Sequence, residues 1–180
     1  DMSVDQFGAR MPQLSFEVVR PAGGGAGRLE NVVRAVNMIP GSGEFALSTD
    51  IVRRRTGPGR ETPENLHGSE AKSDFEASVD QLEAELPNVT RINLVVAWFG
   101  NDLRCGECLV RPGVEIADKV TVPHAWSVAG VERGDAYVVS ATEGRPNFGG
   151  TPSDASVRQA IAALKARGFH VTLYPFLLMD

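Results

Sequence analysis

The chain has 180 residues, 42% hydrophobic and 23% charged, a composition that suits a globular protein with one buried core. Its net charge is −5, and its single basic run, residues 53–55, has no interleaved aromatic residues, which argues against nonspecific binding to nucleic-acid phosphates. No stretch approaches the roughly 20 apolar residues of a transmembrane helix. Residues 1–5 are polar and acidic, unlike a secretory signal peptide.

The alternation of residues 11–20 predicts a strand with Leu14, Phe16 and Val18 on one face. The glycine-rich run at residues 21–27 is typical of a flexible joint. A strand that enters such a joint has no partner nearby in the sequence. We therefore expect residues 11–20 to be the last strand of a domain that precedes the joint.

Residues 29–39 carry their apolar side chains at the spacing of one helical face, and Pro40 ends the pattern. Residues 53–72 are polar and rich in Gly, Pro, Arg and Glu, so we expect a long exposed loop there, with disorder as an alternative. Residues 21–72 are therefore predicted to be a linker with a short helix and an exposed loop.

Two longer helices are predicted further along the chain. Ser73 and Glu76 have the spacing of a capping box at the start of the first. The second has Thr151 as its N-cap, Pro152 at its first position and Gly168 at its end. The residues expected to face the core are Phe75, Val79, Leu82 and Leu86 in the first helix, and Val157, Ile161 and Leu164 in the second.

Three apolar segments, residues 91–99, 135–141 and 170–178, are predicted to be strands, because near-continuous apolar runs are typical of parallel sheets buried on both faces. Helix, strand, strand, helix, strand indicates an α/β fold. Three parallel strands close neither a barrel nor a full doubly wound sheet. We therefore expect the chain to be a piece of a larger polypeptide that shields these strands. The connection between residues 99 and 135 is predicted to be either a small β-hairpin or a surface arm.

The two cysteines, Cys105 and Cys108, form a C-x-x-C pair, which occurs in redox sites and as half of a zinc site. A zinc site needs about four ligands, and the nearest histidine, His124, lies in an ordinary Pro-His-Ala context. A thioredoxin-like motif opens a helix directly after a strand, whereas Arg-Pro-Gly at residues 111–113 follows here. We therefore expect two ordinary thiols, with no metal and no cofactor.

Candidate functional residues lie at the predicted carboxyl ends of the strands, where the loops of parallel α/β folds converge. Acids beside aromatic rings suit a carbohydrate site, since carboxylates act on the glycosidic centre while rings stack on sugars. Three candidates have a structural alternative: a turn acid for Asp102, a solvated loop acid for Glu143 and a core aromatic for Trp98. The candidates for carbohydrate contact are Trp98, Asp102, Glu143, Tyr174 and Asp180.

Three stretches resemble the large tail-tip hub protein, or megatron, of gene transfer agents and related tailed phages. They are IPGSGEFALSTDIVRR, INLVVAWFGNDLRCGECLVRPGVE and, the longest, YVVSATEGRPNFGGTPSDASVRQAIAALKARGFHVTLYPFLLMD. The resemblance covers roughly residues 29–180. The opening stretch, VDQFGARMPQLSFEVVR, is similar to the close of the tail-hub β domain that precedes the barrel in this family.

The resemblance implies that residues 73–180 are the N-terminal part of an incomplete (β/α)8 TIM-barrel-like domain named after glycoside hydrolases. Residues 1–20 would then close the tail-hub domain, with residues 21–72 as the linker. Because catalytic carboxylates of such barrels commonly lie on later strands, no catalytic residue is carried over to this chain.

The function implied is that of a structural component of the distal tail tip, or baseplate hub, acting in host-envelope contact and DNA delivery. The implied partners are two further copies in a homotrimer, other tail and baseplate proteins, and cell-wall glycan. The implied location is a virion-like tail assembled in the cytoplasm and released from the cell. The alternatives are a glycoside hydrolase that degrades cell-wall glycan and a carbohydrate-binding module for host recognition.

Overall fold

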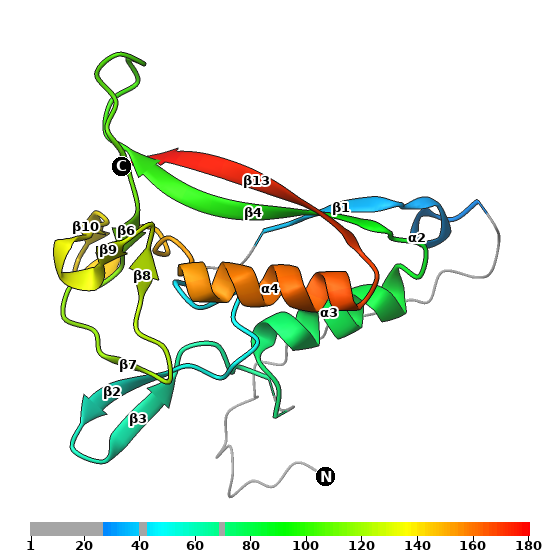
Figure 1. Cartoon of the computed structure of the whole chain (residues 1–180), viewed down its shortest axis with the longest axis horizontal. Helices are drawn as coiled ribbons and strands as arrows, with labels where there is room; N and C mark the ends of the chain where they lie inside the picture. Colours follow the sequence, from blue (N-terminus) through cyan, green and yellow to red (C-terminus); the bar gives the residue numbers. More distant parts are fainter. Residues whose placement is uncertain (1–26, 40–42, 69–70) are drawn as a thin grey trace, which may run out of the picture.

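Three parallel strands form the centre of the fold in a computed structural model that describes residues 27–39, 43–68 and 71–180. They are β1 (Ala35–Met38), β4 (Arg91–Gly100) and β13 (His170–Met179), and they lie side by side in chain order (Figure 1). A short strand, β5 (Val110–Arg111), pairs antiparallel with the end of β4. The predicted strands at residues 91–99 and 170–178 are therefore confirmed.

Two helices, α3 (Asp74–Glu85) and α4 (Asp154–Ala166), cover one face of this sheet (Figure 1). The strand side chains of alternate positions point toward them, as the pleat of a strand requires. This core buries the apolar stripes that the sequence predicted for both helices. Its buried members include Phe75, Val79, Ile92, Leu94, Val96, Ala160 and Leu164.

Serine side chains begin both helices. The hydroxyl of Ser73 accepts a hydrogen bond from the backbone N–H of Glu76, at 3.3 Å, as predicted. The N-cap of α4 is Ser153 rather than Thr151, because the hydroxyl of Thr151 instead accepts the backbone N–H of Gly113, at 3.0 Å. The predicted end of α4 at Gly168 is confirmed by the positive φ of 89° at that glycine.

The prediction of one helix over residues 29–39 is wrong beyond its first turn. Only α2 (Leu29–Val32) is helical, and β1 follows it. Val36 and Met38, two residues apart on β1, both point toward the helices. The apolar spacing that fitted a helical face therefore also fits a strand. What decides between them is pairing with β4, a contact distant in sequence. The expected linker therefore contributes a strand to the sheet.

Residues 53–72 do not form the expected loop throughout. They contain a β-hairpin of β2 (Arg53–Gly57) and β3 (Arg60–Pro63), and β2 also pairs with β7 (Thr121–Val122). Two ion pairs join charged residues of this segment: Arg54 with Glu64 at 3.5 Å, and Arg55 with Glu61 at 3.7 Å. These are the charges that suggested a solvated loop.

The predicted strand at residues 135–141 is not part of the central sheet. Only β10 (Tyr137–Val138) is extended there, and it pairs with β6 (Gly113–Val114) in a separate two-stranded sheet. Val138 is 44% exposed, so the apolar run does not mark a strand buried on both faces.

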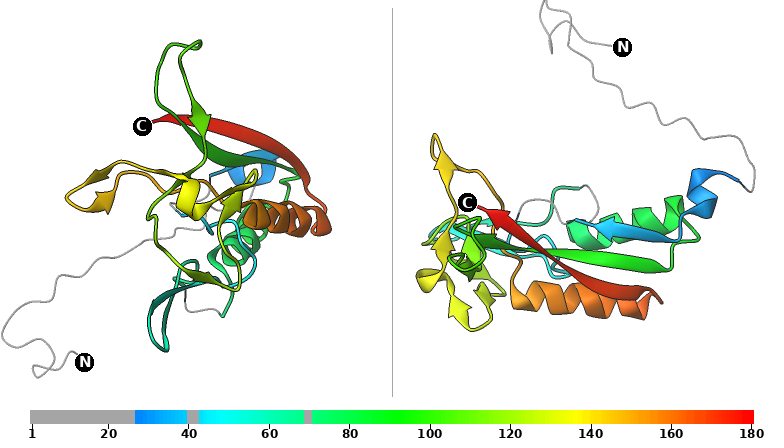
Figure 2. Two further views of the ribbon diagram at one scale, coloured as in Figure 1. Left: turned by 60° about the vertical axis from the view of Figure 1, so that its left-hand side comes forward. Right: turned by 90° about the horizontal axis from the view of Figure 1, so that it is seen from above.

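The connection after β4 contains both structures that the sequence left open. Residues 101–109 form an arm that projects from the end of the sheet (Figures 1 and 2). An accessory region of short strands, residues 110–146, follows it. This region contains β5, β6, β7, β8 (Ser127–Val128), β9 (Val131–Glu132), a 3-10 turn (Arg133–Asp135), β10, β11 (Ala141–Thr142) and β12 (Arg145–Pro146). A second hydrophobic core joins this region to residues 45–52, and it contains Phe45, Val52, Val114, Trp126 and Val128.

The second face of the sheet carries no helix among the described residues (Figure 1). On this face the edge strand β13 leaves Tyr174 43% exposed. Leu173 and Leu177 align with Leu94 and Trp98 of β4, so they lie on the other side of the strand. The helices cover that side only in part, and the two leucines are 55% and 49% exposed. The described part of the chain is thus a mixed α/β structure with three α-helices and several sheets, and it forms no closed barrel.

Candidate functional site

The carboxyl end of β13 places Asp180 beside the end of β4. The backbone N–H of Asp180 donates to the carbonyl of Gly100, at 3.0 Å, which continues the pairing of the two strands. The Asp180 carboxylate then accepts two hydrogen bonds from the accessory region: from the Tyr137 hydroxyl, at 2.8 Å, and from the backbone N–H of Ser140, at 2.7 Å. The sheet end and the accessory region therefore meet at this carboxylate.

Tyr137 is held on two sides. The guanidinium of Arg111, on β5, stacks over the phenol ring with its central carbon 3.7 Å from the ring centroid, a cation–π geometry. The ring of Phe99, at the end of β4, lies 6.1 Å away from that of Tyr137, between centroids. We call Arg111, Tyr137, Ser140, Asn147 and Asp180 the Asp180 cluster.

The two acidic groups of the cluster have opposite tendencies to keep their protons. Burial raises the pKa of Asp180. The hydrogen bonds from Ser140 and Tyr137 and the charge of Arg111 lower it by more than burial raises it, so the pKa lies below the ordinary value. Burial and the bond to Asp180 raise the pKa of Tyr137. At neutral pH the cluster thus holds a carboxylate and a neutral phenol, so Asp180 carries no proton to donate.

An apolar cavity of about 400 Å³ adjoins the cluster on the second face of the sheet. Asn147 belongs to both: it lines the cavity, and its side-chain amide donates to the Ser140 hydroxyl at 2.9 Å. The volume is within the range of small-ligand pockets. The apolar side chains that line it are Ile39, Val95, Ala97, Phe148, Pro152, Phe176 and Leu178.

A second charged cluster surrounds Glu44, which is fully buried after β1. Its carboxylate accepts a hydrogen bond from the guanidinium of Arg133, at 2.9 Å, and one from the backbone N–H of Glu115, at 2.9 Å. The ammonium of Lys119 lies 3.0 Å from Glu44, 2.8 Å from Glu64 and 3.1 Å from Glu115. We call these five residues the Glu44 network.

The Glu44 network stays ionised. Burial raises the pKa of Glu44, but Arg133 and Lys119 lower it more, while burial lowers the pKa of Lys119 and the surrounding carboxylates raise it more. Both oxygens of Glu44 are occupied by partners from this chain. The network therefore fixes the accessory region to the end of β1 and leaves no free carboxylate for a substrate.

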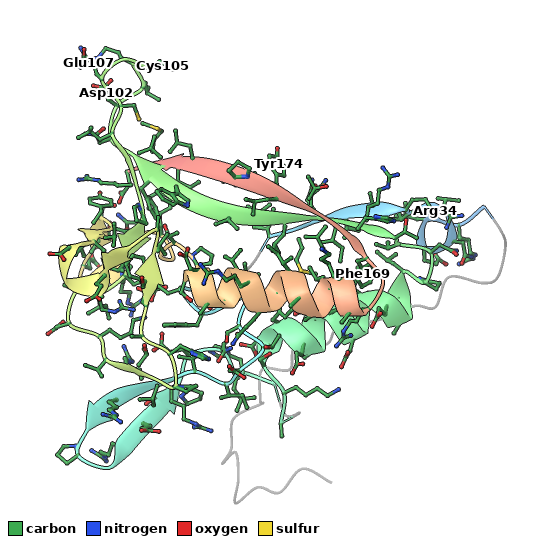
Figure 3. All side chains as sticks on the ribbon, in the orientation of Figure 1. Arg34, Asp102, Cys105, Glu107, Phe169 and Tyr174 are labelled. Atoms are coloured by element: carbon green, nitrogen blue, oxygen red, sulfur yellow. The ribbon has the colours of Figure 1, made fainter. Side chains whose placement is uncertain are left out.

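The structure does not bring the five predicted site residues together. Asp180 belongs to the Asp180 cluster, and Tyr174 lies on β13 with its ring edge-on to Phe176, 5.0 Å between centroids. Asp102 lies on the arm, away from Tyr174 (Figure 3), and pairs with Arg104 at 2.6 Å.

The remaining two candidates fit their structural alternatives. Trp98 is half-buried on the helix-covered face and packs against both hydrophobic cores. Glu143 is exposed in the turn between β11 and β12, with a positive φ of 52°.

Of the residues in these two clusters, only Asp180 was among the predicted site residues, and three of the others show why. Glu44 follows a strand that the sequence suggested was a helix, so its position at a strand end was hidden. Tyr137 was assigned to a buried strand, and Arg111 to a connecting segment. The alternation of apolar and polar residues at 35–38 was the signal for a strand, and a strand there would have placed Glu44 after a strand end.

No protein-family model matches the chain, and a search of the curated proteins finds no match. Among the described residues, no group of three or more histidine, cysteine or carboxylate side chains is placed to hold a metal ion. None of the described helices combines the length and apolar character that crossing a membrane requires. Function is therefore inferred from the geometry and the sequence resemblance.

Proposed function

We propose that the chain is a structural part of the distal tail tip, or baseplate hub, of a phage-like gene transfer particle. In this proposal β1, α3, β4, α4 and β13 are the first units of a TIM-barrel-like domain. The resemblance of the stretches around β4 and from residue 135 to 180 supports the particle assignment.

The topology supports the barrel part of the proposal. The three parallel strands follow one another in chain order, and both crossover helices, α3 and α4, lie on the same side. A doubly wound sheet reverses its order and carries helices on both faces. A (β/α)8 barrel keeps chain order, with every helix outside and the other face turned inward. The second face of this sheet corresponds to that inner face.

The observation that carries the proposal is the uncovered apolar surface of the sheet. On the helix side of the edge strand, Leu173 and Leu177 are about half exposed. On the second face, Tyr174 is 43% exposed and a cavity is lined mainly by apolar side chains. Exposed apolar strand edges pair readily with further strands and mark interaction surfaces. In the proposal, further strands of the barrel and neighbouring hub subunits cover this surface.

Immunogold electron microscopy of particles from producing cells tests the location. An antibody raised against the purified chain should label the distal tail tip, and an antibody against the capsid serves as the positional control. Deleting the gene should also abolish DNA delivery. Gold along the whole tail, or particles that carry no label and still deliver DNA, would refute the tail-tip assignment.

A glycan hydrolase is the second candidate, favoured by the ionised Asp180 carboxylate beside a ligand-sized cavity. Glycoside hydrolysis needs two carboxyl groups roughly 5–10 Å apart. The hydrogen-bond partners of Asp180 among the described residues are a phenol and a backbone amide, so neither of them is the second carboxyl group.

Release of reducing sugar from purified peptidoglycan by the full-length protein separates the candidates. If the protein is a hydrolase, Asp180→Asn should abolish release, while the matched variant Asp102→Asn should retain it, because Asp102 lies on the arm. Binding of the glycan without release would support a carbohydrate-binding module. Neither binding nor release would leave the structural proposal alone.

A further inference from the structure

The arm carries two free thiols at its tip. It leaves the sheet after Gly100 and returns at Val110, where β4 and β5 pair. Cys105 is exposed and Cys108 is half-buried. Figure 3 shows Cys105 and Glu107 at the far end of the arm, away from the sheet and the helices. External reagents can therefore reach this end of the arm.

The backbone between the cysteines forms one helical turn. The N–H groups of Glu107 and Cys108 both donate to the carbonyl of Arg104, at 2.9 and 3.0 Å. In such a turn, residues three apart have Cα atoms about 5 Å apart, from the 1.5 Å rise and 2.3 Å radius of the helix. Disulfides form at Cα separations of about 4.4–6.8 Å. The turn thus brings Cys105 and Cys108 within bridging range.

The turn is anchored at its start and adaptable in its middle. Asp102 accepts the backbone N–H of Arg104 at 2.8 Å and also pairs with its guanidinium. Gly106 stands between the two cysteines in open space. Helical neighbours three apart have Cβ atoms about 5–6 Å apart, whereas a disulfide needs about 3.8 Å. The freedom of Gly106 allows this tightening.

We propose that Cys105 and Cys108 are a dithiol–disulfide pair that exchanges with small-molecule disulfides such as oxidised glutathione. The Cys105 thiolate attacks one sulfur of the oxidant, forms a mixed disulfide and expels one glutathione thiolate. The Cys108 thiolate then attacks the Cys105 sulfur and expels the second. Two electrons pass from the cysteines to the oxidant, and the two protons that the cysteines lose convert both leaving thiolates to thiols.

The difference in exposure sets the order of attack. Cys105 is open to solvent, while the sulfur of Cys108 lies against the end of β4, only 2.8 Å from where a Cβ on Gly100 would stand. Cys105 is therefore the residue that meets the oxidant, and Cys108 is the residue that resolves the mixed disulfide. Closing the bridge repositions the Cys108 sulfur, so the redox state of the arm is coupled to the packing of Gly100. This pair does not depend on the tail-tip proposal.

Mass spectrometry of the chain after equilibration in mixtures of reduced and oxidised glutathione tests the pair. The wild type should lose two hydrogens in a peptide that contains both cysteines. Cys108→Ser should accumulate a glutathione adduct on Cys105, and Cys105→Ser should accumulate at least about tenfold less adduct, because the remaining thiol is shielded. Glu107→Gln is a matched arm variant that should oxidise like the wild type.

Two results would overturn the proposal. One is a wild type that keeps both thiols free in the most oxidising mixture. The other is a wild type that accumulates stable glutathione adducts or disulfide-linked dimers in place of the internal bridge. Far-ultraviolet circular dichroism of each variant checks that the serine substitutions leave the fold intact.

Discussion

Replacing Lys119 by Met tests whether the Glu44 network holds the accessory region in place. The Lys119 side chain is 1% exposed and is the only ammonium group in this network. Methionine has a similar length without the charge, so the substitution removes the ion pairs without opening a large cavity. Removing one partner of a buried ion pair typically costs about 3–5 kcal/mol.

The structure places the expected cost at the lower end of this range. Glu44 keeps its bond to Arg133, and the side chains of Glu64 and Glu115 are 15% and 20% exposed, so water can reach these two carboxylates. We therefore expect a loss of about 3 kcal/mol, which lowers the protection of accessory-region amides against hydrogen exchange about a hundredfold if they exchange by local opening.

Hydrogen–deuterium exchange at pH 7, followed by mass spectrometry, measures this loss in the full chain. Lys165→Met, on the exposed face of α4, is the matched control and should change protection by less than about threefold. A Lys119→Met effect as small as the control effect would refute the reasoning.

The pH dependence supplies a second check. The pKa of Glu44 is below its ordinary value of 4.5, so its charge contributes stability above that pH and loses this contribution as the pH falls through the lowered value. The pKa of Lys119 is above its ordinary value of 10.5, so its contribution is complete below that pH and is lost as the pH rises through the raised value. Lys119→Met leaves the three carboxylates with fewer cationic partners, and protonation relieves this loss. The difference in stability between wild type and Lys119→Met should therefore shrink as the pH falls toward 4. A deficit that grows on acidification would contradict this account.

Two further predictions follow from single contacts. Ser73→Ala removes the N-cap of α3 and should lower the free energy of unfolding by about 1 kcal/mol in urea titrations, whereas Ser78→Ala, exposed inside the same helix, should cost nothing measurable. Asp180→Asn should lower the pKa of Tyr137 toward its ordinary value of 10.0, because the accepting carboxylate is lost. Ultraviolet titration in a Tyr174→Phe background isolates Tyr137, and an unchanged pKa would contradict the hydrogen bond.

Local signals were sufficient for the two long helices. The N-cap of α3 depends on Ser73 and Glu76, three residues apart, and the end of α4 depends on the backbone freedom of Gly168. The apolar runs of β4 and β13 also predicted strands correctly, although β13 is largely exposed at the sheet edge and the same signal was wrong for residues 135–141. These elements could be predicted because their causes lie within a few residues.

Elements stabilised by distant partners could not be predicted in the same way. The β2–β3 hairpin is rich in arginine, and its neighbour Glu64 is paired with Lys119, 55 positions away. The apolar spacing of residues 35–38 fits a helix and a strand equally well. Pairing with residues 91–94 of β4 decides for the strand. Tyr137 was placed in the central sheet because its neighbours are apolar, whereas its hydroxyl bonds to Asp180, 43 positions away.

The two acids that follow the outer strands of the sheet also bear on the choice between the two functions. Glu44 follows β1 and Asp180 follows β13, the positions at which parallel α/β enzymes commonly carry catalytic groups. In this chain both carboxylates bind the accessory region: Glu44 through Arg133 and Lys119, and Asp180 through Tyr137 and Ser140. Both oxygens of Glu44 are engaged, so this carboxylate cannot attack or protonate a glycan without first breaking those bonds. Both bonds to Asp180 end on its Oδ2, so of the two acids Asp180 is the one that hydrolysis could use. The carboxyl end of the sheet thus attaches the accessory region through both acids, and the Asp180→Asn assay decides whether Asp180 also has a catalytic role.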